Sequence, residues 1–108
     1  MDESHKLWFV LDIGVKQRHM KLTKVMVDPQ DDVDDVLVKI YQKLHFELKD
    51  YGITDISILR TKKVDKRYTY TNLSKDENVM ECMKQYGNSI QLPWLVTLCD
   101  IAHMYTRL

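Results

Sequence analysis

The chain has 108 residues, a length that suits one domain with a modest core. Its 16 basic and 16 acidic residues give a formal net charge of zero, which argues against a dedicated nucleic-acid-binding protein. No apolar run approaches the ~20 residues that a membrane-spanning helix needs, so we expect no membrane span.

The two cysteines are too few for a disulfide-rich secreted scaffold, and Cys82 and Cys99 form no metal-binding motif. We expect both thiols to be buried and reduced. The first six residues include two acids, which makes them a poor signal peptide. We therefore expect an intracellular protein of the cytoplasm or nucleus, a single domain over residues 1–108 that is folded over about residues 7–99.

Two apolar stretches near the start of the chain predict an antiparallel hairpin. In residues 7–13, large apolar side chains occupy both faces, which is typical of an interior strand. Gly14 marks the end of that strand, and residues 20–27 predict a second strand after a short connection.

Residues 31–51 are the most periodic part of the chain and predict one long amphipathic helix of about five or six turns. Asp31 or Asp32 is expected to cap its start, and Gly52 is expected to end it in the left-handed conformation. Its apolar stripe consists of Val33, Val36, Leu37, Ile40, Tyr41, Leu44, Leu48 and Tyr51.

The middle of the chain predicts two short strands and a second helix. Residues 55–60 and 68–71 have strand-like composition, and a basic loop connects them. Ser74 and Glu77 have the spacing of a capping box, so we expect a short helix to begin at Ser74 and to end at Gly87.

Residues 90–99 predict the last strand. Pro93 is expected at its beginning or at a position whose backbone amide faces outward, where proline costs no ladder hydrogen bond. The apolar residues of the tail, residues 100–108, fit one helical turn.

This order of elements predicts an α+β fold of the ubiquitin-like (β-grasp) type, and the chain resembles that family over residues 7–99. The resemblance implies a mixed sheet of four to five strands, crossed by one long helix, with a second short helix. The resemblance also implies that the second strand is an exposed edge, and it is compatible with a parallel pairing of the first and last strands. The sequence ends without the Gly-Gly tail of conjugated modifiers, so it is similar to ubiquitin-like modules that serve in binding.

Residues 55–63 resemble the signature of the Crinkler effector N-terminal domain, Leu-x-Leu-Phe-Leu-Ala-Lys. The positions that carry this resemblance are Asp55, Ile56, Ile58, Leu59 and Lys62. Arg60 and Thr61 depart from the family's leucine and alanine, and the tryptophan that usually follows is missing. The resemblance implies a trafficking or recruitment domain of a host-directed effector, which acts in the host cell after secretion.

Two basic clusters are candidate partner-binding surfaces, one in the first hairpin and one in the loop over residues 60–67. A basic edge strand resembles that of Ras-binding domains, which meet an acidic edge of a small GTPase. Alternatively, the hairpin lysines only protect an edge strand from aggregation, and the basic loop is only solvated. The candidate residues are Lys16, Arg18, Lys21, Lys24, Arg60, Lys62 and Lys63.

Five aspartates within residues 28–35 lack the central glycine and distal glutamate of a calcium-binding loop. Helix capping accounts for some of them. The others suggest that this acidic segment pairs with the basic hairpin of a second copy, in head-to-tail self-association.

No nucleophile–base pair, phosphate-binding loop or metal-ligand spacing is visible, so we expect no catalytic residues, no metal and no cofactor. The prediction is a noncatalytic protein-interaction module. The first hypothesis is a Crinkler-type recruitment domain. The alternative is a ubiquitin-like adaptor domain that binds a small GTPase or a scaffold partner through its basic second strand.

Overall fold

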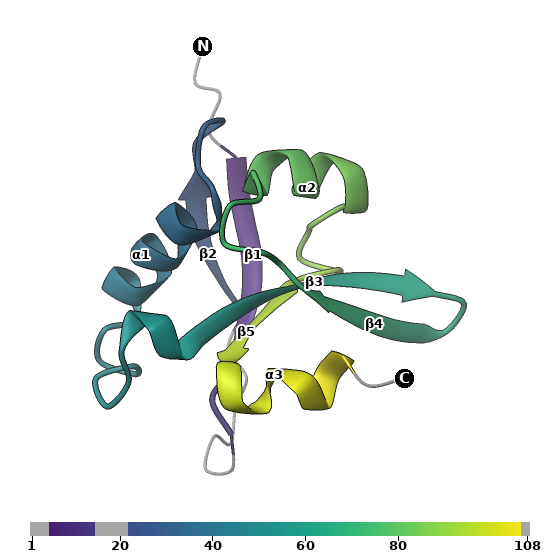
Figure 1. Cartoon of the computed structure of the whole chain (residues 1–108). Coiled ribbons are helices and arrows are strands. Elements are labelled where there is room, and N and C mark those ends of the chain that lie inside the picture. Colours follow the sequence, from purple (N-terminus) through teal and green to yellow (C-terminus); the bar gives the residue numbers. More distant parts are fainter. Residues whose placement is uncertain (1–4, 15–21, 107–108) are drawn as a thin grey trace.

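The protein is described by a computed structural model that covers residues 5–14 and 22–106. Five strands form one mixed sheet in the order β2-β1-β5-β3-β4 (Figure 1). The strands are β1 (His5–Asp12), β2 (Leu22–Val27), β3 (Ile56–Val64), β4 (Arg67–Asn72) and β5 (Trp94–Leu98). The helices are α1 (Val33–Lys43), the short 3-10 helix η1 (Ile53–Asp55), α2 (Val79–Tyr86) and α3 (Cys99–Thr106).

The pairing of the strands confirms the predicted α+β class. β1 pairs antiparallel with β2 and parallel with β5, while β3 pairs antiparallel with both β4 and β5. β2 and β4 are therefore the two edges of the sheet. This order is compatible with a β-grasp fold. No helix in the described ranges is long and apolar enough to cross a membrane.

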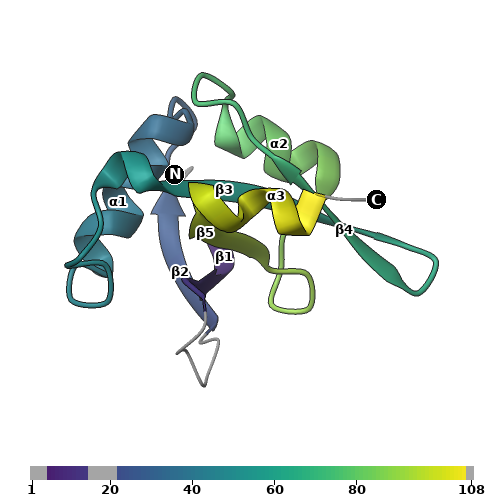
Figure 2. The same cartoon turned by 60° about the horizontal axis from the view of Figure 1, so that its bottom comes forward.

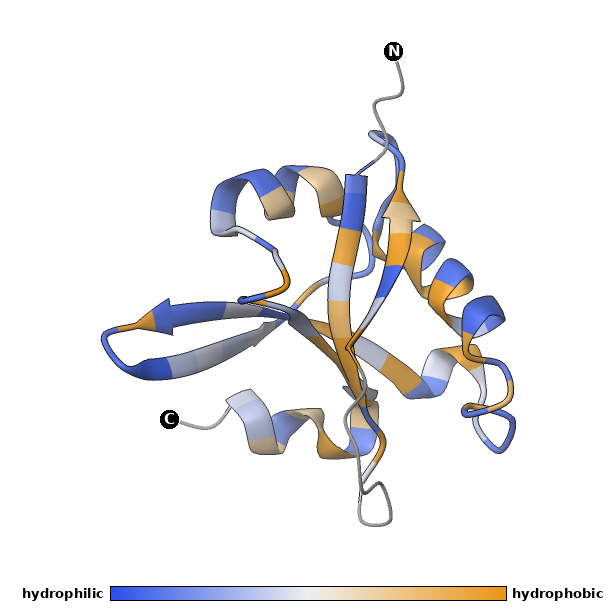
Figure 3. Cartoon of the chain, turned by 180° about the vertical axis from the view of Figure 1, so that it is seen from behind, coloured by the Kyte–Doolittle hydropathy of each residue, from blue (hydrophilic) through white to orange (hydrophobic). Residues whose placement is uncertain are grey.

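The two faces of the sheet are covered by different helices, as the alternation of side chains along each strand requires. On the inner face, Leu7 and Phe9 of β1 are fully buried in one core with residues of α1 and α2. Much of β1 is accordingly apolar in Figure 3. On the outer face, Leu59 and Leu95 form a second, smaller core with Ala102 of α3 (Figure 2).

The predicted long helix is wrong in length, because α1 ends at Lys43 and residues 44–50 form turns. His45 and Phe46, which follow, have low intrinsic helix propensity. The turns still bury Leu48 fully, and Leu44 and Tyr51 pack partly buried against the same core. Gly52 has a φ of −88°, so it does not end the helix in the left-handed conformation.

The predicted cap at the start of α1 is confirmed at Asp32. Its side chain accepts a hydrogen bond from the Asp35 amide at 2.9 Å, and the Asp35 carboxylate accepts one from the Asp32 amide at 3.1 Å. This reciprocal pair satisfies two amides that the helix leaves free. Asp31, the other candidate, is buried and binds Lys39 instead.

The second helix begins later than predicted, at Val79, with Asn78 as its cap. Glu77 does accept a hydrogen bond from the Ser74 amide at 2.7 Å, but this pair closes a turn. The carbonyls of this turn accept hydrogen bonds from the start of α1. The Asp34 amide donates to the Lys75 carbonyl at 3.2 Å, and the Val33 amide donates to the Glu77 carbonyl at 3.0 Å. The end of the helix at Gly87 is confirmed, with a φ of +85° that favours glycine.

The predicted basic loop is part of a β-hairpin. β3 continues to Val64, and β4 begins at Arg67 after a turn in which Asp65 has a φ of 57°. Pro93 directly precedes β5, as predicted. The tail forms the eight-residue helix α3 rather than a single turn.

The two cysteines differ in exposure. Cys82 is buried in the inner core, as expected. The expectation that Cys99 is buried is wrong, because Cys99 opens α3 at the surface. Both thiols are free.

Thr97, in the middle of β5, is fully buried, and its hydroxyl has no hydrogen-bond partner in the described part of the chain. Replacing Thr97 by valine is expected to raise the free energy of unfolding by about 1–3 kcal/mol, because an unsatisfied buried hydroxyl carries a desolvation cost of that size. Urea denaturation measures the change. The matched variant Thr97→Ser keeps the hydroxyl and loses the methyl group, so it should be less stable than the parent. A valine variant less stable than the parent would contradict this account.

Candidate partner-binding site

The basic hairpin lies largely outside the described residues. This applies to Lys16, Arg18 and Lys21, while Lys24 of β2 is described and exposed. The Lys24 ammonium lies 5.4 Å from the centre of the Trp8 ring on β1, a cation–π contact. Their register as partners on adjacent strands places both side chains on the outer face of the sheet.

The β2 edge is protected by two lysines of α1. Lys43 donates a hydrogen bond to the Lys24 carbonyl, and Lys39 donates one to the Met26 carbonyl at 3.2 Å. These carbonyls point away from β1 and are acceptors that an incoming strand would use. The predicted second strand is thus an edge whose acceptors already have partners within the chain.

The three candidate residues Arg60, Lys62 and Lys63 of the β3–β4 hairpin do not form one surface. Side chains alternate along β3, so Arg60 and Lys62 lie on the inner face of the sheet and Lys63 lies on the outer face. The Arg60 guanidinium stacks 3.5 Å from the centre of the Tyr86 ring and so joins the hairpin to α2. The Lys63 ammonium lies on the outer side, 5.8 Å from the centre of the Tyr68 ring.

The residues that resemble the Crinkler signature mainly build the fold. Ile56 and Ile58 are buried in the inner core, and Leu59 is fully buried beneath α3. The Asp55 carboxylate accepts a hydrogen bond from the Gly52 amide at 2.7 Å. Of the five residues that carry the resemblance, only Asp55 and Lys62 are exposed, so a partner can reach only their side chains.

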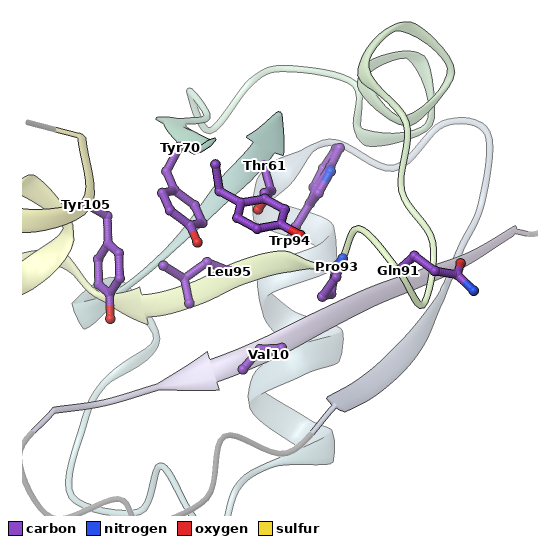
Figure 4. Close-up of a pocket in the computed structure, with 9 residues that line it drawn as sticks. Val10, Thr61, Tyr70, Gln91, Pro93, Trp94, Leu95 and Tyr105 are labelled. Carbon is purple, nitrogen blue, oxygen red and sulfur yellow. The ribbon is translucent and has the colours of Figure 1, made fainter. Parts of the chain in front are cut away.

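A pocket of about 260 Å³ lies on the outer face of the sheet, at residues that no pattern in the sequence had indicated as a site. We call it the outer-face pocket. Five elements contribute to it, together with the loop before β5. Its principal residues are Val10, Thr61, Tyr68, Tyr70, Pro93 and Tyr105, with Gln91, Trp94 and Leu95 completing the lining. Figure 4 shows Tyr105 and Tyr70 on one side of the pocket and Pro93 and Gln91 on the other, with Val10 on the strand below them.

One wall of the pocket is aromatic. Tyr70 of β4 and Tyr105 of α3 contact edge to face, with ring centres 5.5 Å apart and an angle of 72° between the rings. Because α3 covers Leu59 and Leu95, it places Tyr105 beside the strand that carries Tyr70. Tyr68, two residues earlier on β4, lines the same pocket and is 50% exposed.

The opposite end of the pocket is held by hydrogen bonds. The Asn88 side chain pairs with the backbone of Trp8, accepting from its amide at 2.7 Å and donating to its carbonyl at 2.8 Å. The Trp94 indole donates to the Gly87 carbonyl at 2.9 Å. These bonds fix both ends of the loop that carries Pro93, so the pocket is preformed.

The polar side chains of the pocket are hydroxyls and the Gln91 amide, each of which can donate or accept a hydrogen bond. Thr61 is 3% exposed, and its hydroxyl has no hydrogen-bond partner among residues 5–14 and 22–106. Burial raises the pKa of Tyr70, and the neighbouring Tyr68 contributes, so the Tyr70 hydroxyl keeps its proton well into the alkaline range. No acidic residue lines the pocket. Apolar walls with a few converging polar groups are typical of a binding site.

No family model matches the chain, and no curated protein matches its sequence. Over the described ranges, no group of three or more histidine, cysteine, aspartate or glutamate side chains lies in an arrangement that could hold a metal ion.

Proposed function

We propose that this chain is a noncatalytic protein-interaction module that recruits a partner protein through the outer-face pocket. The observation that supports this best is the pocket itself, a preformed apolar hollow of about 260 Å³ with an unsatisfied buried hydroxyl in its lining. Recruitment is also the role that the Crinkler resemblance implies. On this proposal the motif over residues 55–63 supports the sheet, and the pocket above it holds the partner.

The surroundings of the pocket favour a protein over a small molecule. Tyr68 lines the pocket and is 50% exposed, so its ring is accessible from outside the hollow. Ile90 and Met104, the sequence neighbours of lining residues, are exposed as well. Exposed aromatic and apolar side chains around a pocket are typical of an interface with a buried anchor at its centre.

A selection of peptides from a random display library tests the proposal. The immobilised protein should retain peptides from the library. These peptides should bind the Tyr68→Ala variant at least about tenfold more weakly, since truncation of an aromatic anchor lowers affinity by that factor or more. The control is Lys62→Ala, which removes an exposed side chain from the other face of the same hairpin and should bind as the parent does. Recovery of no binder, or of binders indifferent to Tyr68→Ala, would contradict the proposal.

The β2 edge is a second candidate, favoured by its position at the side of the sheet and by the exposed side chains of Leu22 and Met26. A small GTPase or scaffold partner that adds a strand there has to displace Lys39 and Lys43 from the edge carbonyls. The same selection separates the two candidates. Binders that depend on Lys24, and not on Tyr68, would favour the edge.

A further inference from the structure

We infer that the outer-face pocket binds a proline-containing peptide in the polyproline II conformation, with acidic residues beside the prolines. This inference rests on the proposed function and names the partner chemistry of the same site. It is carried by the donors of the pocket, by its position on the sheet and by its charge.

The donors match a peptide that presents mainly acceptors. The phenol hydroxyls of Tyr70 and Tyr105 line the pocket and can donate to acceptors of a ligand, whereas the Thr61 hydroxyl is enclosed by the protein. A polyproline II segment makes no internal hydrogen bonds, and each proline lacks an N–H group. Its carbonyls therefore remain free to accept from hydroxyls that line a groove.

Other peptide conformations fit less well. A helical peptide uses its carbonyls within the helix, so they do not accept from the Tyr70 and Tyr105 hydroxyls. An added strand needs unpaired backbone groups at a sheet edge, whereas this pocket lies over the face formed by β1, β5, β3 and β4. A polyproline II helix docks by placing proline rings between aromatic side chains, and Tyr68, Tyr70 and Tyr105 supply such rings here.

The charge around the pocket selects against a cation and favours acidic flanks. Three tyrosines also resemble the aromatic cages that hold methylated ammonium groups. However, no carboxylate lines this pocket, and the Lys63 ammonium already lies 5.8 Å from the Tyr68 ring centre. A second cation would be repelled there, whereas a glutamate beside the prolines would be attracted.

Titration of the isotope-labelled domain with synthetic peptides tests the inference. The probe is a run of prolines flanked by glutamates. It should shift the backbone signals of Thr61, Tyr70 and Gln91. A matched peptide with alternate prolines replaced by alanine should bind about tenfold more weakly or worse, because it loses ring contacts and preorganisation. A version with lysine flanks should also bind more weakly, and a trimethyllysine peptide should not bind.

Two variants connect the binding to the pocket. Tyr70→Phe keeps the ring but lacks the hydroxyl, so it should stay folded and bind the proline peptide several-fold more weakly. Thr71→Val, on the other face of the β4 edge strand, is the control and should bind as the parent does. Failure of the proline peptide to shift the pocket signals, or equal binding of the alanine peptide, would overturn the inference. If library peptides without proline still depend on Tyr68, the proposed function stands while this inference fails.

Discussion

Replacing Ile40 by alanine is expected to lower the free energy of unfolding by about 2–5 kcal/mol, a large share of the stability of a small domain. Ile40 lies on α1, is fully buried and packs in the inner core between the helix and the sheet. The substitution removes three methyl or methylene groups and leaves a cavity that the surrounding strands fill only in part. Urea denaturation followed by circular dichroism measures the loss.

Two residues of the same region serve as controls for Ile40. Leu44 belongs to the predicted stripe but ends α1 and is only partly buried, so Leu44→Ala should cost less than Ile40→Ala. Val38 is exposed on the other side of α1, and Val38→Ala should change the stability by at most about 0.5 kcal/mol. An Ile40→Ala variant that unfolds at the parent's urea concentration would show that this helix face does not carry the core.

The α+β class and an aspartate cap at Asp31 or Asp32 could be predicted from patterns that are local along the chain. The parallel pairing of β1 with β5 joins distant segments, and it was implied only by the resemblance to the ubiquitin-like family. The alternation of Leu7 and Phe9 with residues of the other face predicts a strand, and the spacing of Val33, Val36 and Ile40 predicts a helix face. Burial follows these patterns directly, because the apolar side chains of one face need one shared core.

The starts and ends of the helices could not be predicted, because distant contacts decide them. Ser74 and Glu77 have the spacing of a cap, yet the carbonyls of their turn accept the first amides of α1, about forty residues earlier. At the other end of α1, the Tyr41 hydroxyl donates to the Tyr51 carbonyl. This bond fixes the end of the turns over residues 44–50 against the helix. Periodicity does not distinguish such a turn from a continued helix, since both bury Leu48.

The candidate site was missed for a different reason. Charge clusters are visible in a sequence, and they indicated the hairpin around Lys24 and residues 60–67 as candidate surfaces. Tyr68 and Tyr70 have the spacing of one strand face, but aromatic residues at that spacing usually indicate core. Only the strand order and the position of α3 bring them together with Val10 and Tyr105.

The acidic segment before α1 also has a role that charge alone did not reveal. Asp28 and Asp31 both bind Lys39, and Asp32 and Asp35 cap the helix, so four of its five acids have partners within the domain. Self-association through this segment stays a prediction. These internal contacts reduce the charge that is free to attract the basic hairpin of another copy.

Replacing Lys39 by methionine is expected to lower the free energy of unfolding by about 1–3 kcal/mol, because it leaves a buried carboxylate without its cation. The Lys39 ammonium binds Asp31, whose side chain is only 8% exposed, and also contacts Asp28 and the Met26 carbonyl at 3.2 Å each. Methionine keeps most of the aliphatic stem. A double variant with Asp31→Asn removes the stranded charge and should recover part of the loss. A Lys39→Met variant as stable as the parent would show that Asp31 does not need this partner.

The contribution of Lys39 should depend on pH in the alkaline range. Partial burial lowers the pKa of Lys39, but the hydrogen bonds and charges of Asp31 and Asp28 outweigh it, so the pKa is raised above the usual 10.5. A cation with a raised pKa in the folded state stabilises fully below its unfolded pKa, and this stability is lost as the pH rises through the folded pKa.

The stability curves of the parent and of Lys39→Met should therefore run parallel up to about pH 10 and converge above it. Burial also raises the pKa of Tyr70, so ionisation of its phenol lowers stability in the same window. Both proteins share that effect, and the difference between their curves isolates Lys39. A difference that stays constant through the alkaline range would mean that Lys39 acts through packing of its stem, and the β2 edge would then owe its protection to Lys43.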